Sequence, residues 1–376
     1  MAARRKICFV LPSLNGGGAE RAAVQILNGL DPNHWDRSMF LFAREGPYLS
    51  ELDPSIELAS ANSASRWSRW RALRAFIARE RPEIVMVFLS YFSVLSAVRA
   101  ANTGAQVIFN LQTPMSAFLT DADYQWRGRW RKAAFAIVTR VGYAAADLIV
   151  ATSQGVASDL TRAFAIDPAR IRVLSNPVDL DRVRAAAMEA IDAAALPPGD
   201  APLIVAAGRL ADAKNYPLMI EALAVLRQKM PARLCILGQG ELEGALRQLI
   251  AARGLGDAVS LAGFQANPWK YIARADVFLL TSRYEGFGNV LIEAMACGVP
   301  VVATASAGTR AIVEPGINGR LVESHTPAAL ADALLGILSD RARLQQLRAT
   351  TPPSTIKFGL PATVARYDTM LREALA

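Results

Sequence analysis

Two glutamates, Glu285 and Glu293, stand on either side of a glycine-bearing turn in the segment EGFGNVLIEAMACGVPVVAT, residues 285–304. The apolar run after the turn predicts a buried helix that begins near Asn289. The first amides of a helix have no partner within it, so those around Phe287–Val290 are expected to face an anion, with the helix dipole behind them. Glu285 lies on the loop and can point at a substrate, whereas Glu293 can accept hydrogen bonds from a diol such as a ribose.

A plainer interpretation of the two glutamates stays open. Glu285 can be a surface acid of the loop, and Glu293 can be a first-turn residue that the helix dipole favours. This interpretation does not explain an acid among the core-like residues of LIEAMACG.

Two cations, Arg209 and Lys214, follow a valine-rich strand candidate in the segment AAGRLADAKNYPLMIEAL, residues 206–223. The carboxyl ends of parallel strands form the binding edge of a sheet, where two cations could share a diphosphate. The alternative is a pair of solvated surface charges. The position directly after a strand favours the functional interpretation.

Two glycine loops follow further strand candidates. Gly16 and Gly17 lie in LNGGGAER, and Gly238 lies in LGQGELEGAL. Glycines there let a backbone approach a phosphate or sugar closely, and the helix that follows offers amides. The alternative is a tight turn without a ligand, and for Gly238 taken alone close packing between strand and helix is the favoured interpretation.

The elements that must position these residues alternate along the chain. Short runs rich in valine and isoleucine alternate with longer periodic segments rich in alanine and leucine, which predicts parallel sheets covered by helices. The predicted strands include Ile7–Pro12, Ile84–Phe88, Val107–Asn110, Leu148–Ala151, Ile171–Leu174, Leu203–Ala207, Arg233–Leu237, Val259–Leu261, Val277–Leu280 and Val299–Ala303. These are too many for one ordinary sheet, and an alanine-rich stretch, residues 176–201, indicates a domain boundary near residue 180. We therefore expect an α/β fold of two Rossmann-like doubly wound domains, residues 1–180 and 181–359.

The composition limits the classes of protein to be considered. The 376 residues carry 41 Lys and Arg against 33 Asp and Glu, a net charge of +8, and half of the chain is apolar. This excludes a disordered chain and favours acidic partners such as phosphates, anionic membrane or nucleic acid. Three cysteines without paired or C-x-x-C spacing indicate buried thiols in a reducing compartment. No apolar run predicts a transmembrane helix or a signal peptide, so we expect a cytoplasmic protein.

The segment SRYEGFGNVLIEAMACGVPVVAT, residues 282–304, closely resembles the signature of the retaining GT-B glycosyltransferases of family four, in which two such glutamates flank the nucleotide-sugar site. The similarity covers nearly the whole chain and includes the first glycine loop, GRLADAKN, LCILGQGELEGALRQLI and GINGRLV. The resemblance implies two domains facing each other across a cleft, with acceptor binding in the N-terminal domain and donor binding in the C-terminal one. It also implies that the last helix, residues 360–376, packs back on the N-terminal domain, and that no metal or cofactor is needed.

By position, the resemblance assigns a role to each candidate residue. Arg209 and Lys214 would hold the donor diphosphate. Glu293 would bind the ribose, and Glu285 would bind hydroxyls of the donor sugar. The other donor-binding residues that it implies are Gly16, Gly17, Gln112, Gly238, Phe264, Phe287, Gly288, Asn289 and Val290.

Two positions depart from the family pattern. Many relatives carry a histidine that touches the donor sugar where this chain has Gln112, and glutamine can hydrogen-bond a hydroxyl but cannot act as a base. Ala311 stands where relatives commonly have a glutamate. Asp121 and Asp123 have D-x-D spacing in a polar loop, and we interpret them as solvated acids rather than metal ligands.

A retaining transfer needs either a covalent carboxylate intermediate or attack from the face that the diphosphate leaves. Glu285 is the one carboxylate to consider as a nucleophile, and the family precedent makes it a binder. We therefore expect same-face attack, with Arg209, Lys214 and helix amides stabilising the departing phosphate. The expected donor is a UDP-linked hexose or N-acetylhexosamine, with GDP-mannose next.

Two segments of the N-terminal half combine tryptophan with arginine, residues 65–82 and 123–140. Helices with both residue types on their faces are suited to an anionic membrane surface. This predicts peripheral contact with the inner face of the cell membrane and a glycan or polyprenyl-linked acceptor, as in polysaccharide assembly. Ordinary surface helices with charged outer faces are the alternative.

Two other classes of protein fit part of the sequence. A basic nucleic-acid-binding protein would stack bases on the interleaved tryptophan and arginine, but it leaves the glutamates and glycine loops unexplained. A Rossmann oxidoreductase would need a G-x-G-x-x-G motif after the first strand and an acid at the end of the second, a pattern that we do not find.

Overall fold

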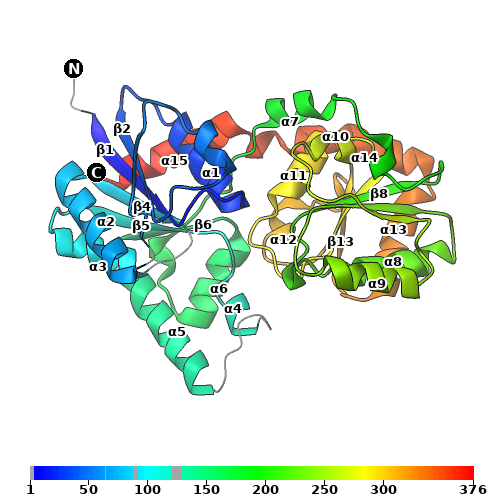
Figure 1. Ribbon diagram of the computed structural model, residues 1–376, viewed down its shortest axis with the longest axis horizontal. Helices are drawn as coiled ribbons and strands as arrows, with labels where there is room; N and C mark the ends of the chain where they lie inside the picture. Colours follow the sequence, from blue (N-terminus) through cyan, green and yellow to red (C-terminus); the bar gives the residue numbers. More distant parts are fainter. Residues whose placement is uncertain (1–3, 64, 89–91, 121–128) are drawn as a thin grey trace. The chain divides into compact units, whose positions relative to one another are not determined.

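The computed structural model describes residues 4–63, 65–88, 92–120 and 129–376. The D-x-D acids Asp121 and Asp123 lie outside these ranges. The chain forms two compact units, Met1–Pro177 together with Leu360–Ala376, and Val178–Gly359. Each unit holds one parallel sheet flanked by helices (Figure 1), so the predicted α/β class with two Rossmann-like sheets is confirmed.

The sheet of the first unit has the strand order β3-β2-β1-β4-β5-β6-β7, with all described pairs parallel. The order reverses at β1, as in other doubly wound sheets. Its strands are β1 Arg5–Leu11, β2 Trp35–Leu41, β3 Glu57–Ser60, β4 Ile84–Phe88, β5 Gln106–Leu111, β6 Leu148–Ala151 and β7 Ile171–Val173.

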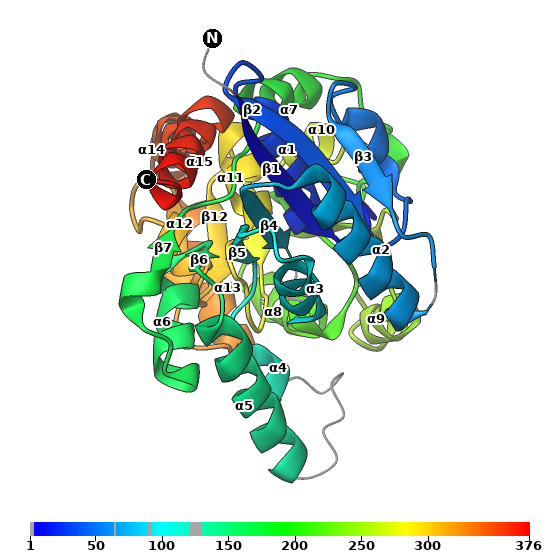
Figure 2. The ribbon, with the colours of Figure 1, turned by 90° about the vertical axis from the view of Figure 1, so that its left-hand side faces the viewer.

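Two apolar clusters cover the faces of this sheet. One joins the strands to α1 and α15, and the other joins them to α2, α3, α5 and α6. The helices of the unit are α1 Gly18–Gly29, α2 Arg66–Glu80, α3 Phe92–Ala101, α4 Ala117–Thr120, α5 Arg129–Ala144, α6 Gln154–Phe164 and α15 Leu360–Ala374. Helix α5 extends past the sheet edge in both views of the molecule (Figures 1 and 2), while its last turn buries Tyr143 against the sheet.

Helix α15 completes the first unit although it follows the second unit in the sequence. The indole Nε1 of the buried Trp35 donates to Asp368 Oδ1 at 2.6 Å, and Asn110 Nδ2 donates to the Tyr367 hydroxyl at 3.0 Å. The side chain of Val364 lies so close to Gly29 of α1 that a Cβ there would meet it at 2.8 Å. Residues 360–374 are therefore part of the core of the first unit.

The sheet of the second unit has the order β10-β9-β8-β11-β12-β13, also parallel throughout. Its strands are β8 Leu203–Ala207, β9 Arg233–Leu237, β10 Val259–Leu261, β11 Val277–Leu280, β12 Val301–Thr304 and β13 Gly319–Val322. Its helices are α7 Leu180–Ala187, α8 Tyr216–Arg227, α9 Glu243–Ala252, α10 Trp269–Ile272, α11 Asn289–Ala296, α12 Thr309–Ile312, α13 Pro327–Leu338 and α14 Arg341–Ser354.

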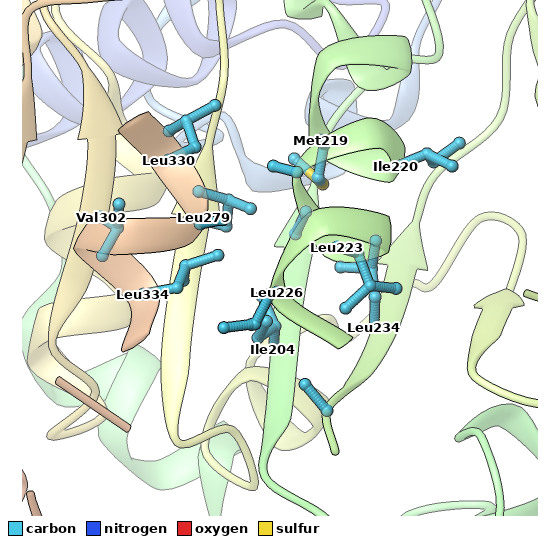
Figure 3. Close-up of a cluster of buried hydrophobic side chains, with 14 of the residues drawn as sticks. Ile204, Met219, Ile220, Leu223, Leu226, Leu234, Leu279, Val302, Leu330 and Leu334 are labelled. Carbon is cyan, nitrogen blue, oxygen red and sulfur yellow. The ribbon is translucent and has the colours of Figure 1, made fainter. Parts of the chain in front are cut away.

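Apolar side chains of α8 and α13 cover one face of this second sheet. Figure 3 shows Leu226 of α8 beside Ile204 of β8, and Leu334 of α13 near Leu279 of β11. A second cluster joins α7, α10 and α11 to the opposite face. The chain enters and leaves this unit side by side, because Val178 N donates to Phe358 O at 3.0 Å.

The strands β2, β3 and β13 were not among the strands that we predicted from the sequence. In β2 the run WDRSMFL contains Arg37, yet its guanidinium is buried because it donates to the carbonyls of Leu27, Asn28 and Leu30 and pairs with Asp53. No hydrophobic alternation reveals such a strand.

In the described part of the chain, no helix has both the length and the apolar character needed to cross a bilayer.

The bond between Trp35 and Asp368 gives a test of how α15 is held. We expect Asp368→Ala to lower the free energy of unfolding by about 1–3 kcal/mol, because it leaves the buried indole N–H without its acceptor. Asp332→Ala is the matched control, since it removes an exposed carboxylate paired with Lys229 and should change stability by less than about 0.5 kcal/mol. Chemical denaturation followed by circular dichroism measures both. Equal losses in the two variants would contradict the role given to Asp368.

Candidate functional site

Four loops at one edge of the second sheet carry the residues that the sequence singles out there. Phe264 follows β10, Gly238 follows β9, and Arg209 and Lys214 follow β8. The two glutamates follow β11, which is the next strand in the sheet. Because all these strands are parallel, their carboxyl ends meet at one edge. The second unit therefore brings its predicted site residues together.

The glycines of these loops permit close backbone packing. A Cβ at Gly238 would lie 2.0 Å from the Gly208 carbonyl oxygen, and one at Gly240 would lie 2.5 Å from that of Leu210. Gly208 N donates to Leu237 O at 2.9 Å, and Gly238 N donates to Gly263 O at 2.8 Å. Three neighbouring loops are thus in direct contact, which is the packing role considered for Gly238 in the sequence.

Lys214 and Glu285 form an ion pair at this edge. Lys214 Nζ lies 2.7 Å from Glu285 Oε2, and the two side chains are 25% and 17% exposed. Ser282 Oγ donates to the same carboxylate oxygen at 3.0 Å. The lysine and the carboxylate therefore compensate each other's charge in a partly desolvated position.

Backbone contacts hold this ion pair in place. Thr281 Oγ1 donates to the carbonyl oxygens of Lys214 and Asn215 at 3.0 and 3.1 Å. Arg283 N donates to Ala213 O at 2.8 Å. The loop after β8 is thus fixed to the loop after β11 at several points, so the pair is built into the fold.

Arg209 lies at the rim of the site. Its side chain is 75% exposed, and Nη2 lies 3.3 Å from Glu241 Oε2. The backbone amide of Glu241, and then Arg209, hold the pKa of this carboxyl below its ordinary value. An exposed ion pair contributes little to stability, so Arg209 can exchange this partner for a phosphate at small cost.

The turn before α11 is braced by a neighbouring loop. The helix begins at Asn289 after Gly288, whose φ of 100° is in the left-handed region that favours glycine. Gly308 N donates to Glu285 O at 2.8 Å. Phe287 is buried and its ring packs edge-on against Phe358, with centroids 5.6 Å apart. Phe287 thus anchors the turn, and its side chain does not face a ligand.

Glu293 lies in the fifth position of α11 and is only 8% exposed. Its Oε2 accepts a hydrogen bond from the indole Nε1 of Trp269 at 2.9 Å. Burial first, and then the Glu293 carboxylate, raise the pKa of the nearby Cys297 thiol to about 12. The plainer interpretation of a first-turn acid at the helix dipole does not fit this buried, hydrogen-bonded position. Nothing in the local sequence indicated Trp269 as its partner.

The first glycine loop of the first unit holds a carboxylate. Gly16 has φ of 100°, and Gly17 is the N-cap of α1. A Cβ at Gly17 would lie 2.2 Å from Glu20 Oε2, and burial raises the pKa of Glu20. Sequence reasoning missed Glu20, although an acid in the first turn of a helix is a visible signal. A phosphate at this loop would have to displace it.

Gln112 belongs to an amide network in the first unit. Its Nε2 donates to Asn110 Oδ1 at 2.5 Å and to Asn176 Oδ1 at 3.1 Å, and its Oε1 accepts from Asn176 Nδ2 at 2.6 Å. Asn110 in turn donates to Tyr367 of α15. Both ends of the Gln112 amide are therefore engaged within the protein.

Phe264, in the loop after β10 of the second unit, is 67% exposed, so most of its side chain is accessible to solvent.

The residues described in the structure contain no cluster of three or more His, Cys, Asp or Glu side chains that could hold a metal ion.

Two family models match the chain. The model described as glycosyltransferase family 4 matches residues 16–182, and the one described as glycosyl transferases group 1 matches residues 187–352.

Two curated relatives align with a part of the chain. It is 38% identical over 199 residues to the N-acetylgalactosamine-N,N'-diacetylbacillosaminyl-diphospho-undecaprenol 4-alpha-N-acetylgalactosaminyltransferase of Campylobacter jejuni, covering 53% of this chain and 52% of the relative. It is 34% identical over 173 residues to the lipopolysaccharide core biosynthesis glycosyltransferase LpsE of Rhizobium meliloti, covering 46% and 48%. The chain thus spans about half the length of these relatives.

Two solved structures share the fold. Alr3699/HepE of Anabaena, in complex with UDP and glucose, superposes with a TM-score of 0.79 at 19% identity, covering 98% of this chain and 100% of that one. Sucrose-phosphate synthase of Thermosynechococcus elongatus gives a TM-score of 0.80 at 21% identity, with 99% of both chains covered.

The brace on the turn before α11 can be tested at Gly308. This glycine has an ordinary φ of −80°, but a Cβ would lie 2.5 Å from both Phe287 N and Phe287 O. We expect Gly308→Ala to lower the free energy of unfolding by about 1–3 kcal/mol, because the turn must move. Gly244→Ala should be neutral or stabilise by up to about 1 kcal/mol, since an added Cβ meets nothing within 4 Å in helix α9. Thermal unfolding compares the two, and equal effects would remove the argument for the brace.

Proposed function

Because this chain belongs to the GT-B glycosyltransferases of family 4, we propose that it transfers a hexose or N-acetylhexosamine from a nucleotide sugar to a hydroxyl of a glycan or lipid-linked acceptor. The observation that carries this proposal is the position of the Lys214–Glu285 ion pair and Glu293 at one edge of the second sheet. A UDP-linked donor is favoured, which agrees with the UDP and glucose of the HepE complex, and GDP-mannose is the alternative. Neither nucleic-acid binding nor hydride transfer would require these carboxylates.

The donor is proposed to bind to the second unit. Arg209 and Lys214 contact the diphosphate, Glu293 the ribose, and Glu285 the hydroxyls of the sugar. The remaining proposed contacts are the Gly238 loop, the backbone around Phe264, and the amides of Phe287, Gly288, Asn289 and Val290.

The ion pair gives the donor a defined effect on the site. A diphosphate that draws Lys214 toward its oxygens takes the cation away from Glu285. The carboxylate then accepts hydrogen bonds from sugar hydroxyls in place of the ammonium group, so neither charge is left without a partner. Ser282 holds the same carboxylate oxygen and limits its movement.

The transfer is proposed to retain the configuration of the sugar and to need no metal. The acceptor hydroxyl attacks from the face that the diphosphate leaves, and the departing phosphate takes the proton of that hydroxyl. Arg209, Lys214 and the amides at the start of α11 stabilise the negative charge on the leaving group. The anomeric coupling constant of the product, measured by NMR, distinguishes retention from inversion.

The acceptor is proposed to bind to the first unit at the inner face of the cell membrane. The name of the Campylobacter jejuni relative includes an undecaprenol diphosphate, which supports a lipid-linked acceptor here. Exposed Trp67 of α2 stacks on Trp70, with ring centroids 5.0 Å apart and planes 2° apart. Arg66 and Arg71 are exposed on the same helix.

Helix α5 supports the membrane contact most directly. Trp130, Ile137 and Val141 are all exposed, and their spacing of seven and four residues puts them on one face of the helix. Arg131 and Arg140 are exposed beside this face. An apolar stripe next to cations fits the boundary between acyl chains and anionic headgroups.

The two glutamates test the donor site. Removing a ribose contact weakens ground state and transition state alike, so we expect Glu293→Gln to reduce UDP affinity by about ten-fold. Glu285→Gln should bind UDP as well as wild type, because Lys214 is then released toward the phosphates, and should lose about ten- to a thousand-fold in turnover at saturating donor. Calorimetric titration with UDP and turnover with labelled nucleotide sugars measure the two effects. The opposite pattern would reverse the assigned roles, and two wild-type-like variants would refute the site.

The apolar stripe of α5 tests the membrane contact. We expect Trp130→Ser with Ile137→Ser to lower partitioning onto vesicles of phosphatidylglycerol and phosphatidylethanolamine by about ten-fold or more. The double variant lacks the two large apolar side chains that the proposed contact transfers from water to the membrane. Met188→Ser with Ile356→Ser is the matched control, because these exposed apolar residues lie in the second unit. Sedimentation with vesicles measures partitioning. Equal losses in both double variants would show that α5 is not the contact.

A further inference from the structure

The carboxylate proposed to bind the ribose has a neutral protein partner. Trp269 Nε1 donates to Glu293 Oε2 at 2.9 Å, and both residues are almost fully buried. An indole N–H can only donate a hydrogen bond, so this contact requires an acceptor and fixes which carboxylate oxygen faces the ring. The carboxylate thus has a set orientation before any ligand arrives.

The surroundings of Trp269 hold the indole itself in place. Asn267 Oδ1 accepts from the Trp269 amide at 3.1 Å, and Asn267 Nδ2 donates to Ala186 O of α7 at 2.8 Å. The guanidinium of Arg182, also on α7, lies over the indole, 5.9 Å from the ring centroid. Such a cation–π contact adds attraction to the ring without competing for its N–H. Two contacts from α7 therefore restrain the residue that orients Glu293.

A neutral donor is suited to this task. A lysine or arginine in the place of the indole would pair with the carboxylate and compete with a ligand for its charge. The indole N–H gives one directed hydrogen bond and brings no positive charge of its own. A carboxylate that it orients can still accept strong hydrogen bonds from hydroxyl groups.

We propose that Trp269 is a positioning residue for nucleotide recognition, which holds the Glu293 carboxylate in the orientation that accepts the ribose 2′- and 3′-hydroxyls. The inference rests on the proposed function, since it assumes that Glu293 binds the ribose. It predicts a specific consequence. Loss of the indole N–H should reduce the preference for ribose over a sugar without these hydroxyls, whereas contacts to the base and diphosphate should stay intact.

The test compares ligands that differ only in the ribose. The probes are whichever of UDP and GDP the wild-type protein binds more tightly, and the 2′,3′-dideoxy analogue of that nucleotide. We expect Trp269→Phe to lower the affinity for the ribonucleotide by about three- to ten-fold, no more than Glu293→Gln does, because the carboxylate stays but is no longer oriented by its hydrogen bond. The affinity for the dideoxy analogue should change by less than two-fold, as measured by calorimetry. A misfolded variant would lose both ligands, so the analogue also reports on folding.

Two further variants sharpen the comparison. Tyr271→Phe is the matched control, because it removes one polar atom from a buried aromatic side chain of the same helix, and it should keep the wild-type preference. Arg182→Met should reduce the preference in the same direction as Trp269→Phe but by less. If Trp269→Phe keeps the full preference while Glu293→Gln loses it, the inference fails and the proposed ribose contact stands. If the wild-type protein shows no ribose preference, the inference and the role of Glu293 fail together.

Discussion

The edge of the second sheet that carries the candidate site depends on one geometric constraint, which is that parallel strands have all their carboxyl ends on the same side of a sheet. Loops from β8, β9, β10, β11 and β12 must share that small area. They fit because Gly208 and Gly238, and likewise Phe287 and Gly308, approach more closely than a Cβ would allow. The charged side chains of these loops are brought within hydrogen-bonding distance by the same crowding. Close backbone packing and the chemistry of the site are therefore one property of the fold.

The two glutamates of this edge are stabilised in different ways. Glu285 has a cationic partner, Lys214, so its charge is compensated. Glu293 accepts a hydrogen bond from the indole N–H of Trp269, a donor that brings no charge of its own. In the printed sequence the two residues differ only in their position relative to a glycine turn. Their partners come from loops after other strands, so the local sequence does not distinguish the ion-paired carboxylate from the one bonded to an indole.

The sequence predicted the parts of the molecule that depend on local pattern. Ten of the strands were visible as apolar runs, and Arg209, Lys214 and Glu285 were visible as polar residues directly after such runs. What escaped prediction depends on tertiary contacts. Strand β2 was hidden because Arg37 is buried through carbonyls that only the folded chain supplies, and Trp269 had no local signal of its bond to Glu293. The pairing of Gln112 with Asn176 was hidden for the same reason, since 64 positions separate them.

The place of α15 in the first unit also affects how the chain folds during synthesis. Residues 178–359 form a continuous segment, so the ribosome delivers the whole second unit in one stretch. The first unit must instead wait for residues 360–374, and until then the β1 face that α15 covers, with the indole of Trp35, lacks its final cover. Domains generally fold from the N-terminus as they emerge, and uncovered apolar surface favours aggregation in the interval. In this chain the first unit is synthesised first but completed last. Its sheet is therefore the part of the chain that most needs protection by chaperones during synthesis.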